Sequence, residues 1–283
     1  MIELKRVHFN QIAGGPQVRD DSDDDCPPPP APACPAAAAA DLPAFFAPDD
    51  RWRRPSDAVA HQAKLFEEGL TGPSPLSGEA RKTKRLTTDQ VLFLAQFSHS
   101  CNAIWDDEQN DVPMSRRQRF NLLLMGQGGS GKTALVQEIV LPVLDFLFPV
   151  DASSNPPQTS LIVCASWAQA ENISTAKHKA VSCHNAAMLC VQSLRNKHMA
   201  PGEKKSALER KWGNKRCLII EEVGTISPAL LNMLLYRSFH GRAERWDVSE
   251  PMYDKLEGAF GRMPLVILLG DFLQLRRCRY SMT

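Results

Sequence analysis

The stretch Gly126-Gln127-Gly128-Gly129-Ser130-Gly131-Lys132-Thr133 determines how the rest of the chain is interpreted. It fits the pattern G-x-x-x-x-G-K-[ST], in which the backbone amides of a glycine-rich turn surround a phosphate group. We expect Lys132 to reach the outer phosphates of a nucleotide and the hydroxyl of Thr133 to hold Mg²⁺. The predicted binding loop consists of Gly126, Gly128, Gly129, Ser130, Gly131, Lys132 and Thr133.

The residues on either side of this loop favour phosphate binding over a glycine-rich surface turn. Residues 120–125 (FNLLLM) are apolar enough for a buried strand that runs into the loop. Residues 134–148 carry apolar side chains at helical spacing, so a helix should follow. A helix that begins beside the loop adds its positive amino-terminal end to the same place. Strand, loop and helix are the context that the motif requires.

The apolar runs predict a parallel sheet. Residues 161–165, 217–220 and 265–269 are short, continuously apolar segments. Ser227-Pro228 predict the start of a helix that continues to about Phe239. A further helix is expected from Leu86 onward. Apolar strands that alternate with helices indicate an α/β fold with helices on both faces of the sheet. In such folds ligands bind at the carboxyl ends of the strands.

An acidic pair follows the strand at 217–220, where a P-loop protein needs a carboxylate. Glu221 is predicted to help hold Mg²⁺, and Glu222 to orient or deprotonate an attacking water. The alternative is that both are solvated glutamates at a strand end. Asp271 and Gln274 follow the strand at 265–269, and we interpret them as a candidate phosphate sensor.

Composition limits the other functions. The chain has 283 residues and a net charge of +1, so nothing global indicates a polyanion-binding protein. No apolar run reaches 18 residues and residues 1–10 lack the apolar segment of a signal peptide, so we expect a soluble intracellular protein without a membrane partner. The eight cysteines form no C-x-x-C pair, which argues against a zinc site and a disulfide framework.

The segments outside the strands are predicted less sharply. Residues 1–85 are rich in Pro, Ala and Asp, and we expect a disordered low-complexity region without a packed core. Residues 166–179 are interpreted as an exposed connection, residues 181–194 as a helix, and residues 197–215 as a basic loop.

Five segments together resemble a known family. Residues 270–275 (GDFLQL) are similar to the third motif of superfamily 1 DNA helicases of the PIF-one type, and residues 126–133 to its first motif. Residues 218–227 (LIIEEVGTIS) resemble the second motif, and residues 86–90 the adenine-reading Q motif. Residues 164–184 resemble the region that contacts single-stranded DNA. The resemblance extends over residues 86–277.

This resemblance implies a RecA-like ATP-binding domain over residues 86–283, with ATP and Mg²⁺ as cofactors and single-stranded DNA as partner. It implies catalytic roles for Lys132, Glu222 and Gln274, metal binding by Thr133 and Glu221, base recognition by Gln90, and DNA contacts by Trp167 and His184. The implied activity is ATP-dependent 5′-to-3′ DNA unwinding. DNA repair, recombination and telomere maintenance, in the nucleus or the mitochondrion, are the implied setting.

The chain departs from the family pattern at several positions. Glu221 replaces the usual aspartate, Trp167-Ala168 replaces a Thr-Gly pair, and Arg276-Arg277 replaces two prolines. We expect the second RecA-like domain, which supplies arginine fingers, to be absent and to come from a partner. Arginine fingers contribute on the order of 10³ to 10⁵ in rate, so hydrolysis by this chain alone should be very slow.

Two other functions remain open at this point. One is a non-catalytic nucleotide-binding remnant of a helicase or mobile element, which the substitution at Glu221 favours. The other is a small-molecule P-loop kinase, which residues 270–275 make less favourable because that class does not need them.

Overall fold

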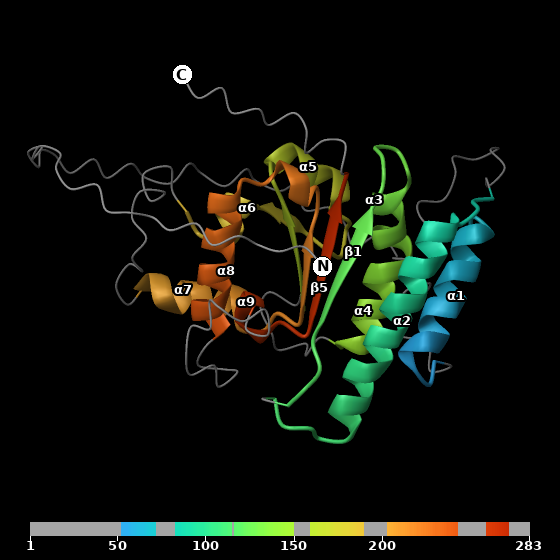
Figure 1. Ribbon diagram of the computed structural model, residues 1–283, viewed down its shortest axis with the longest axis horizontal. Coiled ribbons are helices and arrows are strands. Elements are labelled where there is room, and N and C mark those ends of the chain that lie inside the picture. Colours follow the sequence, from blue (N-terminus) through green and yellow to red (C-terminus); the bar gives the residue numbers. More distant parts are fainter. Residues whose placement is uncertain are drawn as a thin grey trace, which may run out of the picture. The chain divides into compact units, whose positions relative to one another are not determined.

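A five-stranded sheet organises the protein, and all of its strand pairs are parallel (Figure 1). The strand order is β1-β5-β4-β2-β3. The computed structural model describes residues 52–71, 83–114, 116–149, 159–189, 203–242 and 259–271, which all belong to one compact unit, Ala44–Thr283. The strands are β1 (Phe120–Met125), β2 (Ser160–Cys164), β3 (Ala180–Ser182), β4 (Cys217–Ile220) and β5 (Leu265–Gly270).

The predicted α/β class with a parallel sheet is confirmed. All residues of β2 and β4 are buried, as expected for central strands with helices on both faces. Among the described strands β1 pairs only with β5, and it alternates between buried and more exposed residues, with Leu122 and Leu124 facing the core. Leu269 of β5 lies beside Leu124, and Ile267 lies beside Ile219 of β4. β5 therefore separates the strand of the phosphate loop from the strand of the acidic pair.

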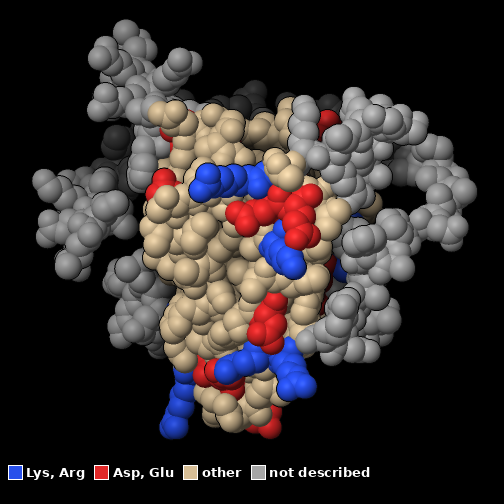
Figure 2. All heavy atoms as spheres, turned by 90° about the vertical axis from the view of Figure 1, so that its right-hand side faces the viewer, with Lys and Arg blue, Asp and Glu red and all other residues tan. Residues whose placement is uncertain are grey.

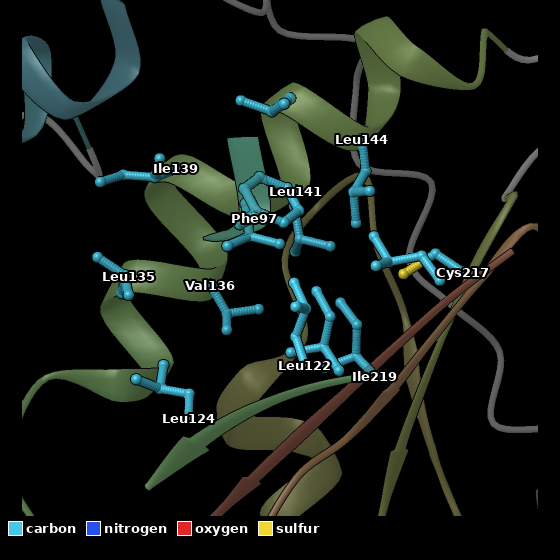
Figure 3. Close-up of a cluster of buried hydrophobic side chains, with 14 of the residues drawn as sticks. Phe97, Leu122, Leu124, Leu135, Val136, Ile139, Leu141, Leu144, Cys217 and Ile219 are labelled. Atoms are coloured by element: carbon cyan, nitrogen blue, oxygen red, sulfur yellow. The ribbon is translucent and has the colours of Figure 1, made fainter. Parts of the chain in front are cut away.

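Two apolar clusters, one on each face of the sheet, hold the helices in place. The first includes side chains of α1, α2 and the helix after the phosphate loop, and the second includes side chains of α6, α7 and α8. Phe97 and Leu135 belong to the first cluster, where side chains from the helices point toward those of the strands (Figure 3). The helices are α1 (Pro55–Glu67), α2 (Thr88–Gln109), α3 (Lys132–Leu135), α4 (Leu141–Leu147), α5 (Trp167–Ile173), α6 (Cys183–Ala186), α7 (Glu203–Trp212), α8 (Pro228–Arg242) and α9 (Ala259–Arg262).

The helix after the phosphate loop contains one π-helical turn, Val136–Val140, between α3 and α4. The amide of Leu141 donates to the carbonyl of Val136, five residues earlier. Pro142 follows and cannot donate, and its ring would collide with the carbonyl of Glu138 in a regular α-helix. The wider turn relieves this conflict without interrupting the helix.

The expectation that residues 1–85 lack packed structure is wrong for residues 52–71. α1 packs against α2 and α4, and it buries Ala58 and Phe66 in the first apolar cluster. Lys84 Nζ lies 2.6 Å from Glu138 Oε2, which also accepts a hydrogen bond from the Thr71 hydroxyl. Residues 1–51 and 72–82 lie outside the described residues. The apolar side chains of α1 are spaced so that they lie on one face of the helix and pack against α2.

Three further expectations differ from the structure. Residues 167–173 form α5 because Ser166 and Gln169 make a reciprocal cap, and Ala170 and Ile173 are buried. Residues 181–194 are not one helix: β3 and the short α6 occupy their first part, and residues 190–194 are not described. Residues 203–212 form α7 in the segment interpreted as a loop.

Candidate nucleotide-binding site

The carboxyl ends of the parallel strands bring the candidate residues to one edge of the sheet. β1 leads into the phosphate loop, Glu221 directly follows β4, and Asp271 directly follows β5. The amide of Gly126 donates to the carbonyl of Gly270 at 3.1 Å, so the ladder between β1 and β5 continues to the first residue of the loop. Loop and acidic side chains therefore lie side by side although they are far apart in sequence.

The phosphate loop has the backbone that its glycines predict. Gly129 and Gly131 have φ angles of +77° and +79°, a region that is costly for residues with a Cβ atom. Lys132 is 7% exposed, and its ammonium group donates to the carbonyls of Gly126 at 2.7 Å and Gln127 at 3.1 Å. The lysine side chain is thus folded over the loop, where it can reach a bound phosphate.

Thr133 and Glu221 contact each other directly. The Thr133 hydroxyl donates to Glu221 Oε1 at 2.8 Å. Glu221 is buried, and burial raises its pKa; the charge of Glu222 acts in the same direction, whereas the bond from Thr133 and the charge of Lys132 lower it. Protonation of this carboxyl group is therefore easier than for a solvated glutamate.

The residues at this point fit a magnesium ion. Glu221 Oε2 is buried and has no hydrogen-bond partner in the described part of the chain. The other carboxylate oxygen, Oε1, accepts the hydrogen bond from the Thr133 hydroxyl. Mg²⁺ usually takes one or two protein oxygens and completes its shell with water and phosphate oxygens. Within the described ranges no group of three or more His, Cys, Asp or Glu side chains could hold a metal alone. The site therefore suits a cation that arrives with phosphate.

Glu222 occupies a strained backbone position. Its φ angle is +52°, which is uncommon for a residue other than glycine. The amide and the hydroxyl of Thr225 both donate to the Glu222 carbonyl, each at 2.8 Å, and hold the turn. Glu222 Oε2 is buried and has no hydrogen-bond partner among the described residues. Backbone strain and an unpaired carboxylate oxygen are typical of a functional position.

Asp271 contacts the phosphate loop. The amide of Gly128 donates to Asp271 Oδ2 at 3.2 Å, and the aspartate is buried. Gln274, the other predicted member of the phosphate sensor, lies outside the described residues.

Gln90 also lies against the phosphate loop. Its side-chain amide nitrogen donates to the carbonyl of Ser130 at 2.9 Å, and its amide oxygen accepts from the backbone of Thr87 at 2.9 Å. Gln90 is 6% exposed. The contact with Ser130 was not predicted, because nothing in the sequence pairs the start of α2 with the loop.

Trp167 and His184 lie at the same edge of the sheet but farther from the loop. They follow β2 and β3, and the strand order places β5 and β4 between these strands and β1. The Trp167 side chain is 57% exposed, and His184 is exposed. Both are accessible to a partner.

Charged side chains do not gather into a single basic patch on the face that carries α1 and α2. Figure 2 shows acidic and basic groups beside one another there, and Arg54 pairs with Asp106 at 2.5 Å. This face of the described chain offers no continuous basic surface for a polyanion.

The sequence did not show that Cys164, the last residue of β2, lies near Glu221. Burial raises the pKa of its thiol to about 12, and the charge of Glu221 contributes. Cys164 and Glu221 lie at the carboxyl ends of β2 and β4, and adjacent parallel strands bring these ends together. The sequence does not tell that β2 and β4 are adjacent, so this contact could not be predicted.

The described residues define a RecA-like P-loop α/β fold. Its features are a glycine-rich loop after one strand, a buried acid after another, a further strand between the two, and helices on both faces of the sheet. No model of a protein family matches the chain, and no curated protein matches it.

Solved structures of Pif1 helicases match the chain, and this is the family whose motifs the sequence resembles. The match to Pif1 helicase from Candida albicans has 18% identity and a TM-score of 0.40, and covers 67% of this chain and 33% of that one. The match to unliganded Pif1 from Bacteroides sp has 18% identity and a TM-score of 0.37, and covers 68% of this chain and 33% of that one. The match to Pif1 helicase from Bacteroides in complex with ADP-AlF3 and ssDNA has 16% identity and a TM-score of 0.37, and covers 66% of this chain and 32% of that one. The chain spans about a third of the length of these structures.

Proposed function

We propose that the chain binds ATP with Mg²⁺ and forms the first motor domain of an ATP-dependent 5′-to-3′ DNA helicase of the PIF-one type. The observation that carries this proposal is the contact between Thr133 and Glu221 beside the buried Lys132. A hydroxyl, a carboxylate and an ammonium group meet where a strand-loop-helix unit presents its backbone amides. This combination suits a nucleoside triphosphate.

The residues divide the work of phosphate binding. The loop amides and Lys132 neutralise the β- and γ-phosphates, and Thr133 and Glu221 would hold Mg²⁺. When bound, the ion supplies positive charge to the phosphate oxygens. Gln274 is proposed, from the motif resemblance, to sense the γ-phosphate.

Glu222 is proposed to orient the attacking water and to accept its proton. Its unpaired carboxylate oxygen is available for this role, and its turn is held by Thr225. A carboxylate with an unpaired oxygen at the carboxyl ends of the strands is suited to general-base work.

Single-stranded DNA is the proposed second ligand, and Trp167 and His184 are its proposed contacts. An exposed tryptophan offers a flat surface on which a base can stack. We propose that unwinding also uses a second RecA-like domain, besides the one that the described residues form. A role in DNA repair, recombination and telomere maintenance, in the nucleus or mitochondrion, is proposed from the motif resemblance alone. None of the helices in the described ranges is both long and apolar enough to cross a membrane.

Calorimetric titration of the full chain with ATP and Mg²⁺, followed by ATPase assays with and without single-stranded DNA, tests the proposal. Lys132→Ala should abolish nucleotide binding, whereas the control Lys177→Ala should not, because Lys177 lies in a half-exposed ion pair with Asp145. Turnover stimulated by DNA supports a motor domain. Equal ATP affinity in Lys132→Ala would show that the loop assignment is wrong.

Nucleotide binding without turnover is the second candidate function. The direct hydrogen bond between Thr133 and Glu221 favours it, because the two side chains bind each other at the place where both would hold magnesium. ATP binding with no hydrolysis at any DNA concentration would support this function over a motor.

A further inference from the structure

We infer that Lys211 of α7 is a positioning residue for the proposed contact between His184 and single-stranded DNA. The inference rests on the proposed function and deepens it, because it names the group that holds His184 toward this partner. Lys211 contacts Asn185, the neighbour of His184, although the two residues are 26 positions apart in the sequence. The role falls to α7, which lies in a segment that the sequence pattern indicates as a basic loop.

His184 combines an exposed side chain with a backbone that is held on both sides. On one side, the amide of Asn185 donates to the Ser182 hydroxyl at 3.3 Å, which caps the start of α6. On the other side, the amide of Leu189 donates to the carbonyl of His184 at 2.9 Å. A side chain on a fixed backbone loses less freedom when it binds a ligand, so this arrangement favours binding.

α6 has only four residues, and the carbonyl groups at its end need partners from outside the helix. The Lys211 ammonium group donates to the backbone carbonyl and to the side-chain oxygen of Asn185. The indole of the fully buried Trp212 donates to the carbonyl of Ala186 at 3.0 Å. The last two residues of α7 therefore cap the last two residues of α6.

The turn after α6 has a strained backbone and depends on this support. Met188 has a φ angle of +52°, a region in which glycine is the usual residue after a helix. The amide of Met188 donates at 3.1 Å to the carbonyl of Asn185, the same group that Lys211 binds. Lys211 thus acts at the carbonyl on which the strained turn closes.

The environment of Lys211 differs from that of a solvated surface lysine. Burial lowers the pKa of its ammonium group to about 8, so the charged form has a cost at this place. The two bonds to Asn185 offset this cost. A third N–H group of the ammonium is left for solvent or for a phosphate, so positioning and direct DNA contact have to be separated by experiment.

Fluorescence anisotropy of the full chain with labelled oligothymidylate compares Lys211→Met, His184→Ala and the double variant. Lys211→Met should weaken DNA binding about three- to tenfold. In the double variant it should add no loss to that of His184→Ala, because it acts through His184. Lys211→Arg should restore binding, since a guanidinium group can donate to both oxygens of Asn185. The dependence of affinity on salt should stay unchanged, because no phosphate contact is lost.

Hydrogen exchange reports on the turn in the absence of DNA. The amides of Met188 and Leu189 should exchange faster in Lys211→Met than in the unaltered chain. Lys64→Met is the matched control, because it removes the same charge from α1, where Lys64 lies in an exposed pair with Glu68. It should change neither the exchange at these two amides nor the DNA affinity.

The possible results separate the inference from the proposed function. Additive losses in the double variant, with a weaker salt dependence for Lys211→Met, would overturn the inference and make Lys211 a direct phosphate contact. Unchanged exchange at Met188 and Leu189 would also overturn it, since the turn would then not depend on Lys211. Failure of the unaltered chain to bind oligothymidylate would reject the proposed DNA partner itself, and the role of Lys211 toward DNA with it.

Discussion

The carboxylate of Asp271 accepts a hydrogen bond from the amide of Gly128, one of the groups that a phosphate loop directs at its ligand. A negative charge at this place repels phosphate oxygens that arrive at the same amides. Asp271→Asn keeps an acceptor for Gly128 and removes the charge, so we expect ATP affinity to rise about three- to tenfold at low salt.

Titration calorimetry at two salt concentrations checks this expectation, because screening should reduce the gain. Asp106→Asn is the control, since Asp106 lies in an exposed pair with Arg54. Weaker ATP binding by Asp271→Asn would instead show that the loop needs the charged carboxylate to keep its shape.

The raised pKa of Glu221 predicts how stability depends on pH. The folded state holds the proton on Glu221 more tightly than the unfolded state does, because burial disfavours the charged form. The contribution of Glu221 to the stability of the nucleotide-free chain should therefore be fully present below the ordinary glutamate pKa and should be lost as the pH rises through the raised value. Glu221→Gln should remove this decline, whereas the exposed Glu171→Gln should retain it. Thermal unfolding between pH 4 and about pH 8 measures the effect.

Glu221→Asp should raise Mg²⁺-dependent ATP hydrolysis. The glutamate is long enough to bond Thr133 directly at 2.8 Å, and removal of one methylene group withdraws the carboxylate and leaves space for an ion between the two. An ATPase titration with Mg²⁺ measures the gain, with Asp106→Asn again as the control. An unchanged rate would show that the length of Glu221 does not limit turnover.

Gly131→Ala should damage the loop, while Gly128→Ala should be tolerated. Gly131 has a positive φ angle and little space for a Cβ atom beside Gln90, whereas a Cβ atom at Gly128 meets nothing within 4 Å. We expect Gly131→Ala to cost about 1–2 kcal/mol in the free energy of unfolding. Urea unfolding of the two variants checks the difference, and equal losses would contradict this account of the loop.

Leu135→Ala tests how firmly the helix after the loop is anchored. The Leu135 side chain is fully buried, and its removal should cost about 2–5 kcal/mol because a cavity remains. Leu92→Ala, at a position that is 59% exposed, should change stability by less than about 0.5 kcal/mol. Similar losses in both variants would mean that Leu135 does not anchor the helix.

The sequence was sufficient to predict the parts of the fold in which one pattern dominates. Four continuous apolar runs became β1, β2, β4 and β5, and a glycine-rich motif identified the loop between the first strand and its helix. The acidic pair was located by its place after an apolar strand, since parallel strands bring their carboxyl ends together.

The remaining parts depend on tertiary contacts that no local pattern reports. β3 has only three residues and is stabilised by pairing with β2, so its sequence was interpreted as the start of a helix. α7 is strongly polar, yet Trp212 in its last turn is fully buried and donates to the carbonyl of Ala186 at 3.0 Å. The contact of Gln90 with Ser130 joins positions 40 residues apart, and it became visible only when α2 was placed beside the loop.

The partners of Glu138 determine where a shortened version of this protein could begin. Glu138 lies on the helix after the phosphate loop, and its carboxylate is shared by Thr71 and Lys84 from the segments after α1. A version that starts at residue 86 would leave this largely buried charge unpaired and would expose the surface that α1 covers. A shortened protein for biochemical work should therefore start before Trp52, because α1 completes the apolar cluster beneath the proposed nucleotide-binding site.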